Sequence, residues 1–221
     1  WDEPSQSGRT CYVDLLNVHP DYQGRSLCRR MLLQMVDSAC EKGYQRMTIG
    51  TWSSNLKAVP LYKKVGFFWK PNTSVSMENY IPMLRGLPIL RDFFAQTDWY
   101  EHYQRELLQV EDKQQHPKTG EMEVYICRWA RPTGEAIEAV IDRKAQTLTG
   151  LETADYAVYT RVAESKPAQG IRYPIEWEVT NKRDQPLRVR LAATGDPYIE
   201  IDHSSDFVLE AGETRTIQVS Y

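Results

Sequence analysis

Residues 17–33, NVHPDYQGRSLCRRMLL, predict the end of a buried strand, a tight turn and the start of an amphipathic helix. The first turn of a helix has backbone N–H groups without intrahelical partners at the positive end of the helix dipole, so it can bind a phosphate. Gly24 permits a positive φ and a close approach of ligand to backbone, and Arg25 adds a cation. Many such turns bind nothing, so this stretch alone leaves an anion site and a purely structural turn as alternatives.

The sequence on either side of this turn predicts an α/β layer. Residues 10–18 form a short apolar run, as expected of a strand that is buried on both faces. Between residues 24 and 42 the apolar side chains recur every three or four residues, which predicts a helix with one buried face, and Gly43 ends it. The positions that form this face are Leu27, Met31, Leu32, Met35, Val36 and Ala39.

The next elements continue the alternation of strands and helices. Residues 45–51 predict a second strand, Ser53, Ser54 or Asn55 caps the helix that follows, and residues 66–70 turn back into a last strand. Strands alternating with helices predict parallel pairing with right-handed crossovers and a ligand near the carboxyl ends of the strands.

Two motifs resemble the GNAT superfamily of acyl-CoA-dependent N-acyltransferases. Residues 55–67, NLKAVPLYKKVGF, match the pattern Asn-x-x-Ala-x-x-Leu-Tyr-x-x-x-Gly-Phe at every defined position. Residues 23–28, QGRSLC, resemble the family's pyrophosphate loop, (Gln/Arg)-x-x-Gly-x-(Gly/Ala). The loop departs from the pattern at Ser26, where Gly is usual, and at Cys28, where Gly or Ala is usual. Both side chains are small and both residues keep their N–H donors, so we expect the phosphate cradle to survive.

The resemblance implies roles for individual residues. Tyr62 would donate a proton to the departing thiolate, with a packed core tyrosine as the alternative. Asp14 is a candidate general base, acting directly or through water, or else an acid at a strand end. Asn55 caps a helix, contacts the cofactor or does both. The residues expected to bind acetyl-CoA as co-substrate are Leu16, Asn17, Val18, Gln23, Gly24, Arg25, Ser26, Leu27, Cys28 and Asn55.

The chain opens on Trp-Asp-Glu-Pro immediately before a strand, which suggests a fragment. The resemblance covers the C-terminal half of an acetyltransferase domain, so we expect a partial GNAT domain at residues 1–80. A helical connector is predicted for 81–120, because Gly86-Leu-Pro88 and the Asp98/Glu101 pair are helix-start signals. The polar stretch 111–120 would form its end.

Residues 121–221 predict an all-β antiparallel sandwich. About seven short runs alternate apolar with charged residues and are separated by Pro, Gly or Asn-Lys turn signals. The runs are 122–129, 136–141, 156–162, 175–179, 187–191, 198–201 and 214–219. The last stretch resembles the ends of immunoglobulin-like accessory domains on bacterial enzymes. The predicted fold class is therefore a partial GNAT α/β fold plus a β-sandwich, joined by a helical connector.

Charge and composition restrict the classes of partner. Residues 1–85 contain 11 Lys and Arg against 7 Asp and Glu, whereas residues 86–221 contain 16 against 23, and a cationic half suits a polyanionic cofactor. No basic and aromatic cluster indicates nucleic-acid binding, and no apolar run is long enough to span a membrane. The four cysteines and four histidines show no metal-ligand spacing, so we expect reduced thiols, no metal and a cytoplasmic protein.

The sequence therefore predicts an N-acyltransferase that moves an acetyl group from acetyl-CoA to a small-molecule or peptide amine acceptor. The fragment alone need not be active, and a homodimer is left open. The alternative is a non-catalytic module with a degenerate GNAT core that senses acyl-CoA or binds a protein or ligand. The acceptor, the general base and the role of the sandwich are not specified by the sequence.

Overall fold

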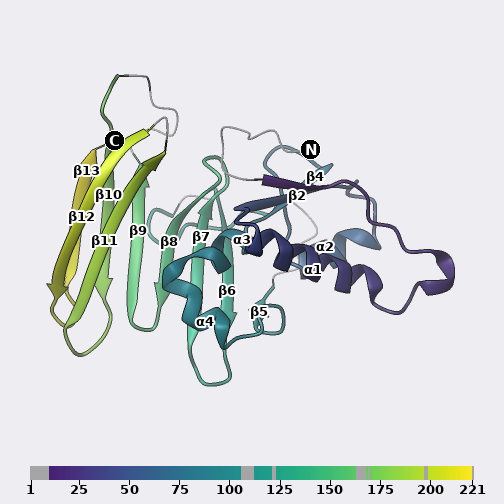
Figure 1. Ribbon diagram of the computed structural model, residues 1–221, viewed down its shortest axis with the longest axis horizontal. Helices are drawn as coiled ribbons and strands as arrows, with labels where there is room; N and C mark the ends of the chain where they lie inside the picture. The colour runs from purple at the N-terminus through teal and green to yellow at the C-terminus, as the bar shows by residue number, and fades with distance from the viewer. Residues whose placement is uncertain are drawn as a thin grey trace. The chain divides into compact units, whose positions relative to one another are not determined.

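The computed structural model describes residues 10–105, 112–120, 123–162, 168, 170–196 and 199–220. The chain divides into two compact units, residues 1–115 and 116–221, whose elements are labelled in Figure 1. The domain boundaries predicted at residues 80 and 120 stay predictions.

The first unit contains a four-stranded sheet with the strand order β1-β2-β4-β3. Its elements are β1 (Thr10–Val13), α1 (Leu27–Glu41), β2 (Arg46–Gly50), α2 (Ala58–Lys64), β3 (Phe68–Trp69) and β4 (Ser76–Asn79). Strands β1 and β2 are parallel, as predicted, with Thr10 opposite Arg46 and Val13 opposite Ile49.

Helix α1 buries the face that its periodicity predicts. Leu32, Val36 and Ala39 are buried on the helix, which contacts β2, where Met47 and Ile49 are also buried. Burying a side chain the size of Leu or Val contributes about 1.5–3 kcal/mol, so this face accounts for much of the stability of the layer. The helix ends as predicted, because Gly43 follows its last turn with a φ of 70°.

The sheet is not the all-parallel arrangement that the alternation predicted. Strand β4 lies between β2 and β3 and is antiparallel to both. Its sequence, SMEN, has low β-propensity and shows no apolar run, which is why it was missed. Asn79 supports the strand's end from the core: its amide nitrogen donates to the Val65 carbonyl at 2.9 Å and its amide oxygen accepts from the Ile81 N–H at 2.8 Å.

The helices that follow begin at Ile81, the first residue of the predicted connector and ahead of the Gly86-Leu-Pro88 start signal. They are α3 (Ile81–Gly86), the 3-10 turn η2 (Pro88–Leu90) and α4 (Arg91–Ala95), and the short strand β5 (Tyr103–Gln104) comes after them. Asp98 accepts hydrogen bonds from the N–H groups of Tyr100 and Glu101, as a cap does, but no helix follows it up to residue 105. The side chain closes a turn instead. Residues 106–111, the rest of the helix that the Asp98/Glu101 signal predicted, lie outside the described residues.

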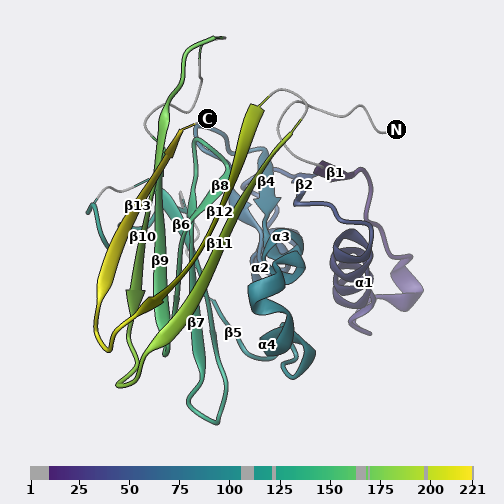
Figure 2. The same ribbon diagram turned by 60° about the vertical axis from the view of Figure 1, so that its left-hand side comes forward.

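The second unit is rich in antiparallel strands. They are β6 (Val124–Ala130), β7 (Ala136–Asp142), β8 (Thr147–Thr153), β9 (Tyr156–Val162), β10 (Pro174–Asn181), β11 (Leu187–Asp196), β12 (Ile199–Leu209) and β13 (Thr214–Ser220). Six of them lie in the order β13-β10-β9-β8-β7-β6, while β11 and β12 pair with each other as a ribbon (Figure 2). Strand β8 was not predicted, because Gly150 interrupts its apolar run. The sandwich arrangement stays a prediction.

One face of the six-stranded sheet carries a small apolar cluster. Its members come from β6, β7 and β9 and are all buried: Val124, Ile126, Val140, Ala157 and Tyr159. Burying this face is what fixes the pairing register, since a slip by one residue would turn every one of these side chains to the opposite face.

Candidate functional site

The candidate site begins where β1 separates from β2. The last paired residues are Val13 and Ile49, and residues 14–19 belong to neither helix nor strand. The strand predicted for 10–18 is therefore shorter, so Leu16, Asn17 and Val18 lie in a loop that projects beyond the sheet (Figure 1). The 3-10 turn η1 (Pro20–Tyr22) follows, and the Gln23 side chain donates to the Val18 carbonyl at 3.3 Å, which ties the loop to itself.

Two residues of the turn into α1 have a left-handed backbone conformation. Gly24 and Ser26 both have positive φ, 75° and 57°. The first hydrogen bond of α1 runs from the Arg30 N–H to the Ser26 carbonyl at 3.0 Å, so the N–H groups of residues 27–29 come before the intrahelical ladder. A Cβ at Gly24 would meet no atom within 4 Å, which means that the space beside this backbone is open.

The charge around the turn is positive. No acidic residue lies in the first turn of α1, and Arg25, Arg29 and Arg30 lie in or next to it. The Arg25 guanidinium lies over the Tyr22 ring, 5.4 Å from the centroid, and Arg29 lies 5.9 Å from the Tyr100 ring. These cations add to the dipole of α1, so the turn favours an anionic group.

Tyr62, on α2, interacts electrostatically with Cys28 in the first turn of α1, although the two residues are far apart in the sequence. The side chain is buried on α2 and packs against Phe67, with ring centroids 6.1 Å apart. Burial and, second, the nearby Cys28 raise the pKa of the Tyr62 phenol above its ordinary value. The fold therefore brings Tyr62 close to the first turn of α1, and the phenol keeps its proton at neutral pH.

Asn55 closes the turn that leads into α2. Its side-chain oxygen accepts the Ala58 N–H at 3.1 Å, and its amide nitrogen lies 3.4 Å from the Thr51 hydroxyl. This is the helix-capping role that the sequence indicates, although Asn55 lies three residues before Ala58, the first residue of α2.

Asp14 is separate from these groups. It is exposed and, within the described part of the chain, forms no hydrogen bond or ion pair. It borders a hollow of about 390 Å³ between β1 and α1, whose lining includes Gln34, Ser38 and Lys42 but neither Tyr62 nor the turn at 23–28. The structure thus brings Cys28 and Tyr62 together and leaves Asp14 apart from them.

A buried ion pair next to Tyr62 was not predicted. The Asp112 carboxylate accepts from the Lys63 ammonium and from the Trp69 backbone N–H, both at 2.6 Å. The Lys63 and Asp112 side chains are only 4% and 7% exposed. Asp112 therefore holds the end of α2 and strand β3 together. No sequence signal distinguishes it, because it lies in a polar stretch that resembles a solvated linker.

Comparison with known proteins agrees with the family resemblance of residues 23–28 and 55–67. Residues 1–67 match the acetyltransferase (GNAT) family. The chain is 38% identical over 50 residues to the L-amino acid N-acyltransferase MnaT of Escherichia coli (strain K12), a stretch that covers 23% of this chain and 29% of that protein. It is 30% identical over 60 residues to the thialysine N-epsilon-acetyltransferase of Sus scrofa, covering 27% and 35%.

A third relative is the spore coat polysaccharide biosynthesis protein SpsD of Bacillus subtilis (strain 168), with 28% identity over 57 residues, or 26% of this chain and 20% of that protein. The chain thus spans between a fifth and about a third of the length of these three relatives. No solved structure matches it. The family match and the two N-acyltransferases support a GNAT acetyltransferase domain at residues 1–67.

Two further properties concern metals and membranes. In the ranges that the structure describes, no group of three or more His, Cys, Asp or Glu side chains is placed to hold a metal ion. Among the described helices none is long and apolar enough to cross a membrane.

Proposed function

We propose that the first unit is part of an N-acetyltransferase that transfers an acetyl group from acetyl-CoA to the amine of a small molecule or peptide. The observation that carries this proposal is the turn at Gly24 and Ser26, which opens a 15-residue helix and has Tyr62 beside it. The family match at residues 1–67 supports it independently.

The N–H groups of residues 24–28 would hold the pyrophosphate of the co-substrate, with Gln23 and Arg25 at the rim. Five adjacent donors at the positive end of α1 match the charge and the acceptor oxygens of a diphosphate. Leu16, Asn17 and Val18 leave the sheet just before this turn, so their backbone groups are available to the amides of the pantetheine arm. Asn55, beside α2, would contact the same arm.

The reaction needs one proton removed and one supplied. The acceptor nitrogen attacks the thioester carbonyl carbon, the carbon–sulfur bond breaks, and the departing thiolate takes a proton. Tyr62 would supply that proton, because its raised pKa keeps the phenol protonated until a strongly basic group develops next to it. Asp14 is the proposed base for the amine proton, through water, since it borders a hollow that Tyr62 does not line. Holding the two reactants together would supply most of the rate.

A second function, acyl-CoA sensing without turnover, is favoured by one observation. Ser26 adopts a left-handed conformation, where the family usually has Gly, and this costs a residue with a side chain about 1 kcal/mol. A strained loop would bind the co-substrate less tightly than the family pattern implies.

Calorimetry with CoA and thiol release over a panel of amines test both functions in the full-length protein. Gly24→Val should abolish CoA binding, because a β-branched residue strongly disfavours this φ. Gly212→Val is the matched control, since Gly212 has a φ of 71° and equally open surroundings in the second unit. Equal CoA affinity in both variants would place the anion site elsewhere.

Turnover separates the enzyme from the sensor. Tyr62→Phe should lower kcat roughly ten- to a thousandfold with CoA affinity unchanged, because only the transition-state proton donor is removed. Wild-type turnover in Tyr62→Phe would refute the role of the phenol. CoA binding without thiol release for any amine would establish the sensor instead.

A further inference from the structure

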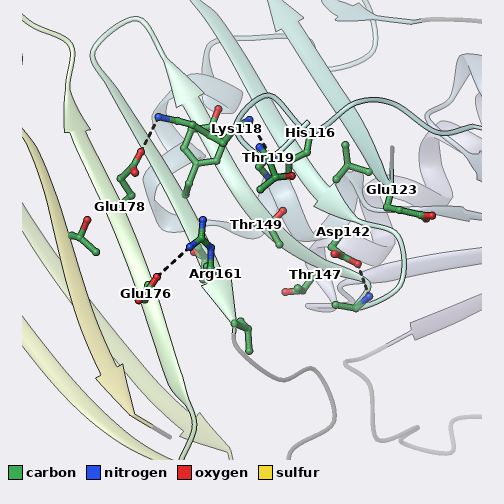
Figure 3. A pocket seen from close by; sticks show the side chains of 16 residues that line it. His116, Lys118, Thr119, Glu123, Asp142, Thr147, Thr149, Arg161, Glu176 and Glu178 are labelled. Carbon is green, nitrogen blue, oxygen red and sulfur yellow. Dashed lines mark hydrogen bonds and ion pairs between the residues drawn. The ribbon is translucent and has the colours of Figure 1, made fainter. Parts of the chain in front are cut away.

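A hollow of about 470 Å³ lies on one face of the six-stranded sheet, with every lining residue between His116 and Thr216 (Figure 3). Its volume falls within the range of sites that bind small ligands. Most of the lining residues carry a polar or charged group, and five of them are threonines, Thr119, Thr147, Thr149, Thr160 and Thr216.

The floor is built by one row of residues that face each other across neighbouring strands. Gly150 lies opposite Tyr159, which lies opposite Glu178, which lies opposite Thr216, so all four share one face of the sheet. The Tyr159 ring lies across Gly150, where a Cβ would come within 2.7 Å of the ring. The missing side chain of Gly150 is therefore what lets this ring lie low and leaves a depression above the sheet.

A turn at residues 116–120 forms one wall. His116 Nδ1 accepts the N–H groups of Lys118 and Thr119 at 3.1 and 3.2 Å, which fixes the turn. The Lys118 ammonium reaches back over the sheet, 5.2 Å from the Tyr159 ring centroid and 2.8 Å from a Glu178 oxygen. Figure 3 shows this bond spanning the upper part of the hollow.

The next cross-strand row forms the other side. Arg161 lies opposite Glu176, with 3.7 Å between nitrogen and carboxylate oxygen, and Figure 3 shows the two side chains pointing toward each other. The Asp142 carboxylate accepts the N–H groups of Lys144 and Ala145, both at 2.7 Å. Thr147, opposite Asp142, adds an exposed hydroxyl.

The charges in this hollow are matched within the protein. Lys118 is paired with Glu178 and Arg161 with Glu176, so an anionic ligand finds no uncompensated cation. Asp142 is engaged by backbone donors, and Glu123 lies 3.7 Å from Arg143 and 3.6 Å from Lys144, so a cationic ligand finds no uncompensated carboxylate. Only three of the lining residues, Val124, Ala145 and Val162, have wholly apolar side chains.

We propose that this hollow is a saccharide-binding site. A hydroxyl group both donates and accepts a hydrogen bond. Each of the two ion pairs puts a cationic donor next to a carboxylate acceptor, Lys118 with Glu178 and Arg161 with Glu176, which suits two adjacent hydroxyls of an uncharged sugar ring. The threonine hydroxyls between the pairs extend the same complementarity.

Affinity electrophoresis of the full-length protein tests the site. The gels contain one neutral polymer each: hydroxyethylcellulose, galactomannan, xylan, laminarin or glycol chitin. We expect at least one polymer to retard the protein, and Arg161→Ala or Glu176→Ala to weaken its binding about tenfold or more, as expected for a hydrogen bond to a charged group. Arg188→Ala is the matched control, because Arg188 forms an exposed cross-strand pair with Asp206 outside the hollow. It should bind like the wild type.

Thr216→Trp provides a second variant, since it fills the hollow from an exposed position without removing either ion pair. Thr216→Trp should also weaken the binding of the polymer. Retardation by none of the five polymers, or equal retardation of the hollow variants and Arg188→Ala, would overturn the proposal. Retention on heparin or polylysine instead would overturn the choice of a neutral ligand. Because every lining residue lies in the second unit, Tyr62→Phe should leave saccharide binding unchanged, so this site and the acetyltransferase can fail separately.

Discussion

Replacing Asp112 by Asn should destabilise the first unit far more than an exposed polar substitution does. The Asp112 carboxylate lies 2.6 Å from the Lys63 ammonium, and both side chains are almost completely buried. At that separation two unit charges attract by about 6 kcal/mol in a medium with an effective dielectric constant of about 20. Desolvating both ions offsets most of this attraction, so the intact pair adds little net stability.

Breaking the pair is a different matter. Asp112→Asn keeps an oxygen that can accept the Trp69 N–H but faces the buried Lys63 ammonium with a neutral amide. Removing one partner of a buried pair costs about 3–5 kcal/mol, a large part of the roughly 5–15 kcal/mol that stabilises a domain. Lys63→Met should cost a similar amount. The double variant Lys63→Met/Asp112→Asn buries no charge and should be more stable than either single variant, so the coupling energy should exceed the cost of one single variant, about 3–5 kcal/mol.

Hydrogen exchange of the α1 and β2 amides at increasing urea concentration measures this stability in the first unit alone. Tryptophan fluorescence would not report on the first unit alone, because Trp69 and Trp99 lie in the first unit and Trp129 and Trp177 lie in the second. Lys118→Met, followed through the amides of β9 and β10 in the second unit, is the control. Lys118 forms a 2.8 Å pair with Glu178 in which both side chains are more than a third exposed, so its loss should cost less than about 1 kcal/mol. Additive costs in the double variant, or a cost for Asp112→Asn as small as the control's, would refute the reasoning.

Two more predictions concern backbone strain and pH. Ser26→Gly should stabilise the first unit by at most about 1 kcal/mol in the same exchange experiment, because it relieves a left-handed conformation and removes no capping bond. Ser38→Gly, inside α1, is the control and should destabilise the unit. Destabilisation by Ser26→Gly would show that the serine is favourable there. Burial and the carboxylate of Glu152 raise the pKa of Tyr159, so the folded second unit holds this proton more tightly than the unfolded chain. Its contribution to stability is complete below about pH 10, the unfolded value, and is lost as the pH rises beyond it, so the urea midpoint should fall there in the wild type and fall less in Tyr159→Phe; equal slopes would contradict this.

The parts of the fold that sequence predicts are those with local causes. The periodic apolar face of α1, the positive φ of Gly43 and the turn at Gly24 each depend on residues within one or two helical turns of each other. The helix-closing role of Asn55 is equally local, since its partner is Ala58. For the same reason the motif at residues 55–67 could be read from the chain, but the interaction of Tyr62 with Cys28 depends on how segments distant in the sequence come together.

The features that sequence did not predict depend on contacts distant in the chain. Asp112 bonds residues 43 and 49 positions away, and in the sequence it is one more charge in a polar stretch. Strand β4 is stabilised by its place between β2 and β3 and by the buried Asn79, whereas its own residues favour neither helix nor strand. The role of Asp14 stays a prediction: its place on the strand predicted for 10–18 suggested a base, whereas the strand ends at Val13 and the Asp14 side chain is exposed.

The hollow of the second unit depends on the pairing register of its strands, which explains why no sequence motif predicts it. Arg161 and Glu176 become neighbours only because β9 and β10 pair with these two residues opposite each other. Moving either strand by one residue would turn one side chain of the pair to the other face of the sheet, since side chains alternate along a strand. Gly150 lacks a side chain beneath Tyr159, and this shapes the floor of the hollow. In the sequence the same glycine interrupts the apolar run, so it weakens the prediction of a strand at this position. A ligand site of this kind is therefore encoded in the pairing of four strands, and variants that keep the register while changing single lining residues are the ones that can test it.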